Sequence, residues 1–283
     1  MKIRSFESVV VNYKAVFFDA FGVLKNHKGL IPGIEKTFDF LDEHNIDYYI
    51  LTNDASRSPA DLANWYQSRG VECIKTEHII SSGMLAHDWL SLKIKGGKVG
   101  YLGTEQSAHY IETAGLETLP ISKLDLNDDI DDIKCFVFLD DEGFDWNNDI
   151  NKVINLLRKK NMPVIVANTD KNYPVSRTDI AVAVGGLSDL VEEILGKHFI
   201  RFGKPDAQMF MFGYEKALLK QPLTRDEILM VGDTLFTDII GGNKFGMDTT
   251  LVLSGNTLQE NAKVKIRSTG IIPTYVCESI VVS

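Results

Sequence analysis

The chain has 283 residues, a length that allows a large hydrophobic core and two domains. Its hydrophobic fraction of 44% and its charged fraction of 24% are ordinary for a soluble globular protein. The formal net charge of -9 argues against nucleic acid or an anionic membrane surface as the main partner.

The cysteine content and the lack of long apolar stretches indicate the cellular compartment in which the protein is expected. Cys73, Cys135 and Cys277 are odd in number and far apart, which predicts neither a disulfide framework nor a zinc site. The N-terminal residues carry charges with no long apolar segment behind them, and no stretch approaches the roughly 18 apolar residues of a membrane-spanning helix. We therefore expect a cytoplasmic protein without a signal peptide or membrane anchor.

The first predicted strand covers residues 15–18, an apolar run that ends at Asp19 and is soon followed by Gly22. The run has no alternation of apolar and polar residues, which is typical of a strand covered on both faces in a parallel sheet. Ligands of open α/β sheets bind at the carboxyl ends of the strands, so Asp19 is a candidate functional residue. An aspartate before a glycine is also ordinary turn chemistry, so Asp19 alone does not decide between the two interpretations.

Repeating strand and helix patterns follow. We expect a helix from Pro32-Gly33 to residue 44, a strand at residues 47–51, and a helix that begins at Ser58-Pro59 and ends at Gly70. A second series has strands at residues 98–102, 134–139 and 163–167 and helices at residues 106–113 and 148–160. The first pattern then returns, with helices at residues 187–195 and 206–219 and a strand that precedes Asp233. The fold class predicted by these repeats is α/β, with a doubly wound parallel sheet.

The second series interrupts the first, which predicts an inserted domain. We place a core domain at residues 1–85 and 181–283 and an inserted α/β cap domain at residues 86–180. The cap is expected to select the substrate and to close over the site, with contacts from residues 140–145 and 170–173.

Three later apolar runs also end in polar groups that suit an anion or a metal. The first ends at Thr52-Asn53, the second stretch contains Gly203-Lys204-Pro205, and the third leads to Asp233 and Asp238. A carboxylate, a hydroxyl with an amide, a lysine and a carboxylate pair supply a nucleophile, oxygen donors and a cation site, which are the requirements of phosphoryl transfer.

In this order the groups resemble the motifs of the haloacid dehalogenase superfamily. The large insertion between the second and third motifs, the segment Ser56-Arg57-Ser58-Pro59 and the terminal Val-Leu-Ser-Gly255 resemble its NagD-like phosphatases with an α/β cap, over nearly the whole chain. The resemblance implies a Mg²⁺-dependent phosphatase that acts on a small phosphorylated metabolite such as a sugar phosphate. A homo-oligomer is compatible with it.

The resemblance also implies roles for individual residues. Asp19 would be the nucleophile that forms an aspartyl-phosphate, and Lys204 would orient it. Thr52, Asn53 and Lys204 would bind the phosphate. Mg²⁺ would take a carboxylate oxygen of Asp19, the backbone carbonyl of Phe21 and a carboxylate oxygen of Asp233, while Asp238 would support the water ligands or Lys204.

Phe21 departs from the pattern of these phosphatases, which have a second aspartate two residues after the nucleophile as general acid and base. Because such catalysis is worth about 10²- to 10⁴-fold, we expect slow turnover of esters with poor leaving groups. The alternative function is a phosphate-ester binding protein with little or no catalysis. Asp19-Ala-Phe-Gly22 also resembles the haloacid dehalogenases, which need no such acid. We rank dehalogenase activity third, because those enzymes have no metal and the carboxylates of Asp233 and Asp238 would repel Asp19 in a site without one.

Overall fold

The first sheet contains both the first predicted strand and the last. A computed structural model describes residues 2–128, 130–176 and 179–282. In this part of the chain, six parallel strands pair in the order β15 (Tyr275–Cys277), β14 (Asp248–Val252), β13 (Ile228–Gly232), β1 (Ala15–Phe18), β4 (Asp47–Thr52) and β5 (Ile79–Ser81). The predicted strand at residues 15–18 is confirmed as β1, with neighbours on both sides.

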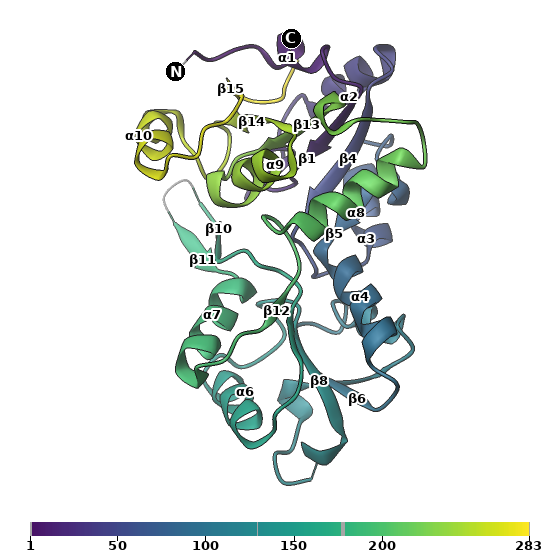
Figure 1. Ribbon diagram of the computed structural model, residues 1–283, viewed down its shortest axis with the longest axis vertical. Helices are drawn as coiled ribbons and strands as arrows, with labels where there is room; N and C mark the ends of the chain where they lie inside the picture. Colours follow the sequence, from purple (N-terminus) through teal and green to yellow (C-terminus); the bar gives the residue numbers. More distant parts are fainter. Residues whose placement is uncertain (1, 129, 177–178, 283) are drawn as a thin grey trace.

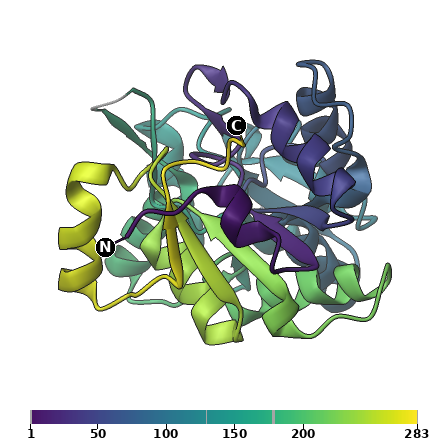
Figure 2. The same ribbon diagram turned by 90° about the horizontal axis from the view of Figure 1, so that it is seen from above.

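Alternate side chains of each strand enter different hydrophobic clusters, which explains the unbroken apolar runs. Phe17 and Leu51 pack on the face covered by α8 (Ala207–Leu218) and α9 (Ile240–Phe245). Phe18 and Ile50 pack on the opposite face with α2 (Ile34–Glu43) and α3 (Pro59–Gln67). Figure 2 shows the strands between these green helices and the purple-blue helices on the other side. The predicted doubly wound arrangement is therefore confirmed.

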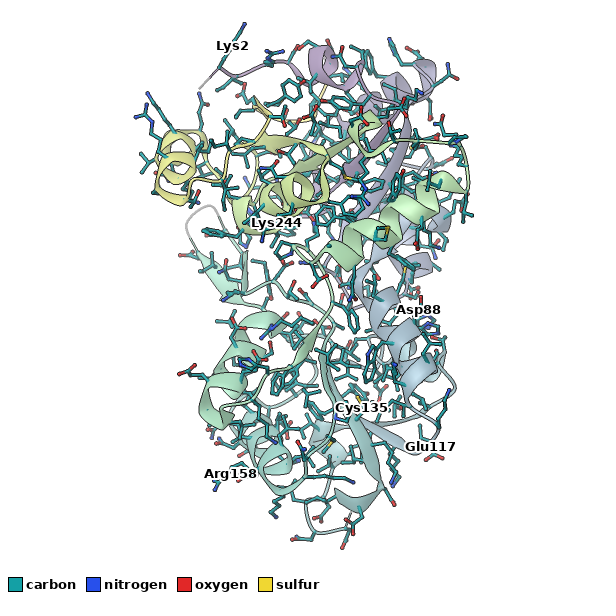
Figure 3. The ribbon with its side chains drawn as sticks, viewed as in Figure 1. Lys2, Asp88, Glu117, Cys135, Arg158 and Lys244 are labelled. Atoms are coloured by element: carbon teal, nitrogen blue, oxygen red, sulfur yellow. The ribbon has the colours of Figure 1, made fainter. Side chains whose placement is uncertain are left out.

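A second parallel sheet forms the lower half of the molecule in Figure 1. Its strand order is β12 (Ile200–Arg201), β9 (Val164–Val166), β8 (Ile133–Phe138), β6 (Lys98–Leu102) and β7 (Glu117–Pro120). α6 (Asn148–Lys159) and α7 (Val184–Leu195) pack on one face of it. The other face shares a hydrophobic cluster with the first sheet, and Cys135, labelled in Figure 3, is fully buried there.

The insertion extends further along the chain than the sequence analysis placed it. β12 pairs with β9, so the second sheet continues to Arg201, about twenty residues beyond the predicted end at residue 180. The helix predicted at residues 187–195 is α7, and it packs on the second sheet and not on the core sheet. A strand of two residues has no periodicity that a sequence pattern could detect.

The remaining elements include hairpins and helices outside the two large sheets. Two antiparallel hairpins are β2–β3 (Lys25–Asn26, Gly29–Leu30) and β10–β11 (Asn172–Pro174, Ile180–Val182). The other helices are α1 (Phe6–Val10), α4 (Ser82–Lys93), α5 (His109–Glu112) and α10 (Gln259–Thr269). No described helix has the length and hydropathy needed to span a bilayer.

Candidate active site

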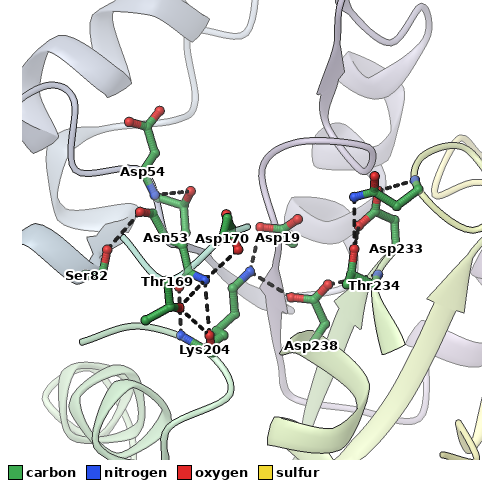
Figure 4. Close-up of polar contacts among 12 residues, drawn as sticks. Asp19, Asn53, Asp54, Ser82, Thr169, Asp170, Lys204, Asp233, Thr234 and Asp238 are labelled. Carbon is green, nitrogen blue, oxygen red and sulfur yellow. Dashed lines mark hydrogen bonds and ion pairs between the residues drawn. The ribbon is translucent and has the colours of Figure 1, made fainter. Parts of the chain in front are cut away.

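Four of the predicted site residues meet at the carboxyl edge of the first sheet. Asp19 follows β1, Thr52 ends β4 and Asp233 follows β13, and these three strands are adjacent. The side chain of Lys204 reaches the same edge from the loop before α8, as Figure 4 shows. The chain order of the motifs and the topology of a parallel sheet therefore bring the predicted groups together.

Lys204 is the central cation of this site. Only 2% of its side chain is exposed, and its Nζ lies 2.5 Å from Asp19 Oδ1 and 2.7 Å from Asp238 Oδ1. Burial alone would lower the pKa of Lys204, but the two neighbouring carboxylates outweigh it and raise the pKa. Lys204 is therefore a fixed positive charge that holds Asp19 in place.

Three carboxylates share this single lysine. Asp19, Asp233 and Asp238 each offer an oxygen within 4.8 Å of the others. Burial, together with repulsion from Asp19, raises the pKa of both Asp233 and Asp238. One ammonium leaves about two negative charges uncompensated in a region removed from water, and a hard divalent cation with oxygen ligands would offset them.

Glycines allow the carboxylates to lie this close to the backbone. A Cβ atom on Gly22 or on Gly255 would lie 1.9 Å from Asp233 Oδ2. Asp233 also accepts hydrogen bonds from Thr234 Oγ1 (2.7 Å) and from the backbone N–H of Asn256 (2.6 Å), so its position is determined from several sides. The donor set is a pre-formed cluster of hard oxygen ligands, which fits Mg²⁺ better than a softer metal.

The side chain of Asn53 is held by hydrogen bonds to other parts of the chain. Its Nδ2 donates to Thr169 Oγ1 (3.1 Å), Asp170 Oδ1 (2.9 Å) and the carbonyl of Lys204 (3.2 Å), and its Oδ1 accepts from the Lys204 N–H (2.7 Å). The side chain is 1% exposed and does not line the cavity described below. These contacts fix the backbone of Lys204 and the chain segment that leaves β9, and phosphate binding by Asn53 stays a prediction.

A cavity of about 1150 Å³ lies over these groups, between the two sheets. Asp19, Phe21, Thr52 and Lys204 line it from the core. The opposite wall comes from the two segments predicted to supply cap contacts, and contains Asp140, Asp141, Glu142 and residues 170–173. Burial, and then repulsion from Asp141, raises the pKa of Asp140 to about 7.

Sequence reasoning did not single out Lys25, which also lines the cavity. It stands six residues after Asp19, and no periodicity or motif in the sequence marks it. The hairpin β2–β3 folds this residue back toward Phe21, so only the three-dimensional structure shows its proximity to the site.

Comparisons with known proteins agree with this geometry. A model of haloacid dehalogenase-like hydrolases matches residues 16–117, and a second model, described as HAD-hydrolase-like, matches residues 201–281. The chain is similar to mouse (Mus musculus) chronophin, with 27% identity over 94% of this chain and 90% of that protein. It is also 27% identical to the ribonucleotide monophosphatase NagD of Escherichia coli, over 92% of this chain and 96% of that protein.

A solved structure is closer in sequence. The crystal structure of a possible sugar phosphatase from Cytophaga hutchinsonii is 55% identical, with a TM-score of 0.96, and the match covers 100% of this chain and 99% of that one. Similarity at this level extends over both sheets and includes the loops that carry the site. The chain therefore belongs to the haloacid dehalogenase superfamily, within its NagD-like group.

Proposed function

We propose that this protein is a Mg²⁺-dependent phosphatase of small phosphate esters such as sugar phosphates, acting through an aspartyl-phosphate. The observation that carries the proposal is the cluster at the sheet edge, where Asp19 lies 2.5 Å from Lys204 beside the buried pair Asp233 and Asp238. The relatives named as a sugar phosphatase and a nucleotide monophosphatase support the same reaction class.

In this mechanism Asp19 attacks the phosphorus atom and the bond to the ester oxygen breaks. Lys204 holds Asp19 and adds positive charge to the phosphate, and Thr52 lies at the cavity wall where its hydroxyl can contact a phosphate oxygen. Asp19, the carbonyl of Phe21 and Asp233 would hold Mg²⁺, with Asp238 behind them. The metal would neutralise the charge of the phosphate and reduce its repulsion from Asp19.

The inserted part of the chain is proposed to select the substrate. The segments around Asp140 and Tyr173 face the core site across the cavity, so a leaving group attached to the phosphate would lie against them. Tyr173 is oriented by a hydrogen bond from its hydroxyl to Asp141 Oδ2 (2.9 Å). Groups that hold one another in this way form a defined surface for the leaving group.

The test is release of inorganic phosphate from p-nitrophenyl phosphate in the presence of Mg²⁺, with Asp19→Asn as the blank. p-Nitrophenolate leaves without prior protonation, so this substrate examines the nucleophile and the metal site independently of any general acid. We expect release that requires Asp19 and is abolished by EDTA. Release that Asp19→Asn does not reduce would refute the proposed nucleophile.

The second candidate is a phosphate-ester binding protein, and Phe21 is the residue that favours it. Phe21 lines the cavity, and its side chain cannot supply or remove a proton. The binding function predicts that sugar phosphates bind to both the wild type and Asp19→Asn in calorimetry, while neither protein releases phosphate from any ester.

A further inference from the structure

Several titratable groups line the cavity, and each is a candidate for protonating a leaving alkoxide in place of Phe21. Arg57 is a permanent cation that does not give up a proton. Lys204 is engaged by Asp19 and Asp238. Partial burial would raise the pKa of Asp54, but Lys25 and hydrogen bonds from Ser56 outweigh it and lower the pKa, so Asp54 is ionised and has no proton to donate.

Lys25 emerges from the backbone directly beside Phe21. The carbonyl of Lys25 accepts a hydrogen bond from the N–H of Gly22 (2.7 Å), and its own N–H donates to the carbonyl of Ala20 (3.1 Å). Residues 21 and 25 form a bridge in this tight turn, and Gly22 supplies the positive φ of 82° that the turn requires. The lysine side chain therefore starts next to the position at which related phosphatases carry their acid.

The ammonium group of Lys25 has two partners among the described residues. Its Nζ lies 3.6 Å from Asp54 Oδ2 and 5.2 Å from the centre of the Trp65 ring, and 19% of the side chain is exposed. Asp54 is itself fixed, because the N–H (3.0 Å) and Oγ (2.6 Å) of Ser56 both donate to its Oδ1. Neither contact of the ammonium is a proposed metal ligand, and the ion pair joins it to Asp54, another residue of the cavity lining.

The other lysines of the cavity are directed elsewhere. Lys171 pairs with Asp189 (2.7 Å) and its side chain is 72% exposed. Lys265 donates to the carbonyl of Asn256 (3.0 Å). Asp140 is the main competing acid, because burial raises its pKa to about 7, and it lies on the wall of the cavity opposite Lys25. Asp141 and Asp170 line the same wall and also have raised pKa values, but Asp141 accepts from Tyr173 and Asp170 accepts from Asn53.

We infer that Lys25 is the general acid and base of this phosphatase, in place of the missing aspartate, and that Asp54 is its positioning residue. The inference rests on the proposed function. In the first step Asp19 attacks phosphorus, the bond to the ester oxygen breaks, and the Lys25 ammonium gives that oxygen a proton, which leaves an alcohol and a neutral amine. In the second step water attacks phosphorus, the bond to Asp19 breaks, and the amine takes the proton of the water.

The test compares esters whose leaving groups differ in their need for a proton. Phosphate release is measured for Lys25→Gln with glycerol 3-phosphate and with aryl phosphates ranging from p-nitrophenyl to unsubstituted phenyl. We expect kcat for the alkyl ester to fall by about 10²- to 10⁴-fold, and kcat for the p-nitrophenyl ester by less than about tenfold. The dependence of rate on leaving-group basicity should therefore become steeper. Asp54→Asn should show the same pattern more weakly.

Two further variants make the result specific. Lys28→Gln removes the same charge from the exposed turn of the same hairpin, outside the cavity, and should retain the wild-type ratio of alkyl to aryl rates. Phe21→Asp, introduced into Lys25→Gln, should restore alkyl-ester turnover, because it supplies a carboxylic acid two residues after Asp19.

Several outcomes would overturn the inference. An equal loss for all esters in Lys25→Gln would make Lys25 a phosphate-binding charge. Wild-type alkyl turnover that Lys25→Gln leaves intact and Asp140→Asn removes would assign the acid to Asp140. A wild type that hydrolyses only the p-nitrophenyl ester would show that no residue serves as acid. In contrast, the absence of Asp19-dependent release from every ester would refute the proposed function itself, and this inference with it.

Discussion

Replacing Lys204 with methionine tests the charge balance at the sheet edge. The substitution keeps most of the side-chain volume and removes the cation that lies 2.5 Å from Asp19 Oδ1 and 2.7 Å from Asp238 Oδ1. At an effective dielectric constant of about 20, each of these contacts is worth roughly 6 kcal/mol of Coulomb energy. Desolvation of the buried charges cancels much of this, and removal of one partner of a buried ion pair typically costs about 3–5 kcal/mol.

We therefore expect Lys204→Met to lower the free energy of unfolding by about 3–5 kcal/mol, measured by urea denaturation in EDTA. The control is Lys14→Met, which breaks an ion pair with Glu227 (2.6 Å) in which the lysine side chain is 56% exposed. Such an exposed pair contributes little to stability, because water and salt screen it. Adding Mg²⁺ should narrow the difference between wild type and Lys204→Met, because the metal would neutralise the same carboxylates.

A loss for Lys204→Met no larger than that for Lys14→Met would refute this reasoning. It would mean that water or protonation reduces the repulsion among the carboxylates without help from the lysine. The charge-balance argument for a divalent cation at Asp19, Asp233 and Asp238 would then lose its basis.

Two further predictions concern the surroundings of the site. Burial raises the pKa of Asp170 from 3.8 to about 6, so the folded state favours the neutral carboxyl. The stability that depends on this group is therefore fully present below about pH 4 and is lost as the pH rises through 6. Asp170→Asn keeps an acceptor for Asn53 and should raise the free energy of unfolding at pH 7 by about 3 kcal/mol, with no gain at pH 4; an equal gain at both pH values would contradict it. Gly22→Ala places a Cβ 1.9 Å from Asp233 Oδ2 at a φ of 82°, and should destabilise by several kcal/mol, whereas Gly29→Ala, with φ 114° and no atom within 4 Å, should show only the backbone strain of about 1–3 kcal/mol. Equal thermal shifts for the two alanine variants would contradict the proposed clash.

The sequence predicted the core sheet and the meeting of its polar residues because these follow from short-range patterns. The apolar run at residues 15–18 has no alternation, and this is the property of a strand buried on both faces. Once Asp19 and Asp233 are placed after parallel strands, topology brings them to one edge. No tertiary information beyond the fold class is needed for this step.

The features that the sequence did not predict depend on contacts between distant segments. The hydrogen bonds of the Asn53 side chain could not be predicted, because its partners Thr169 and Asp170 lie more than a hundred residues away. The position of Lys25 depends on a hairpin of two-residue strands, which has no period to detect. β12 also has only two residues, so the sequence did not predict it or the extent of the second sheet.

The short strand β12 has a consequence for engineering this protein. It ends at Arg201, and the chain reaches Lys204 three residues later, where the backbone is tied to Asn53 and to Thr169 Oγ1 (2.7 Å). The lysine that orients Asp19 is thus built on a direct extension of the inserted sheet. Grafting the insertion of a relative into this chain would have to preserve residues 168–170 and 200–204 as one unit, since a graft joined inside them would displace Lys204 even if both sheets folded.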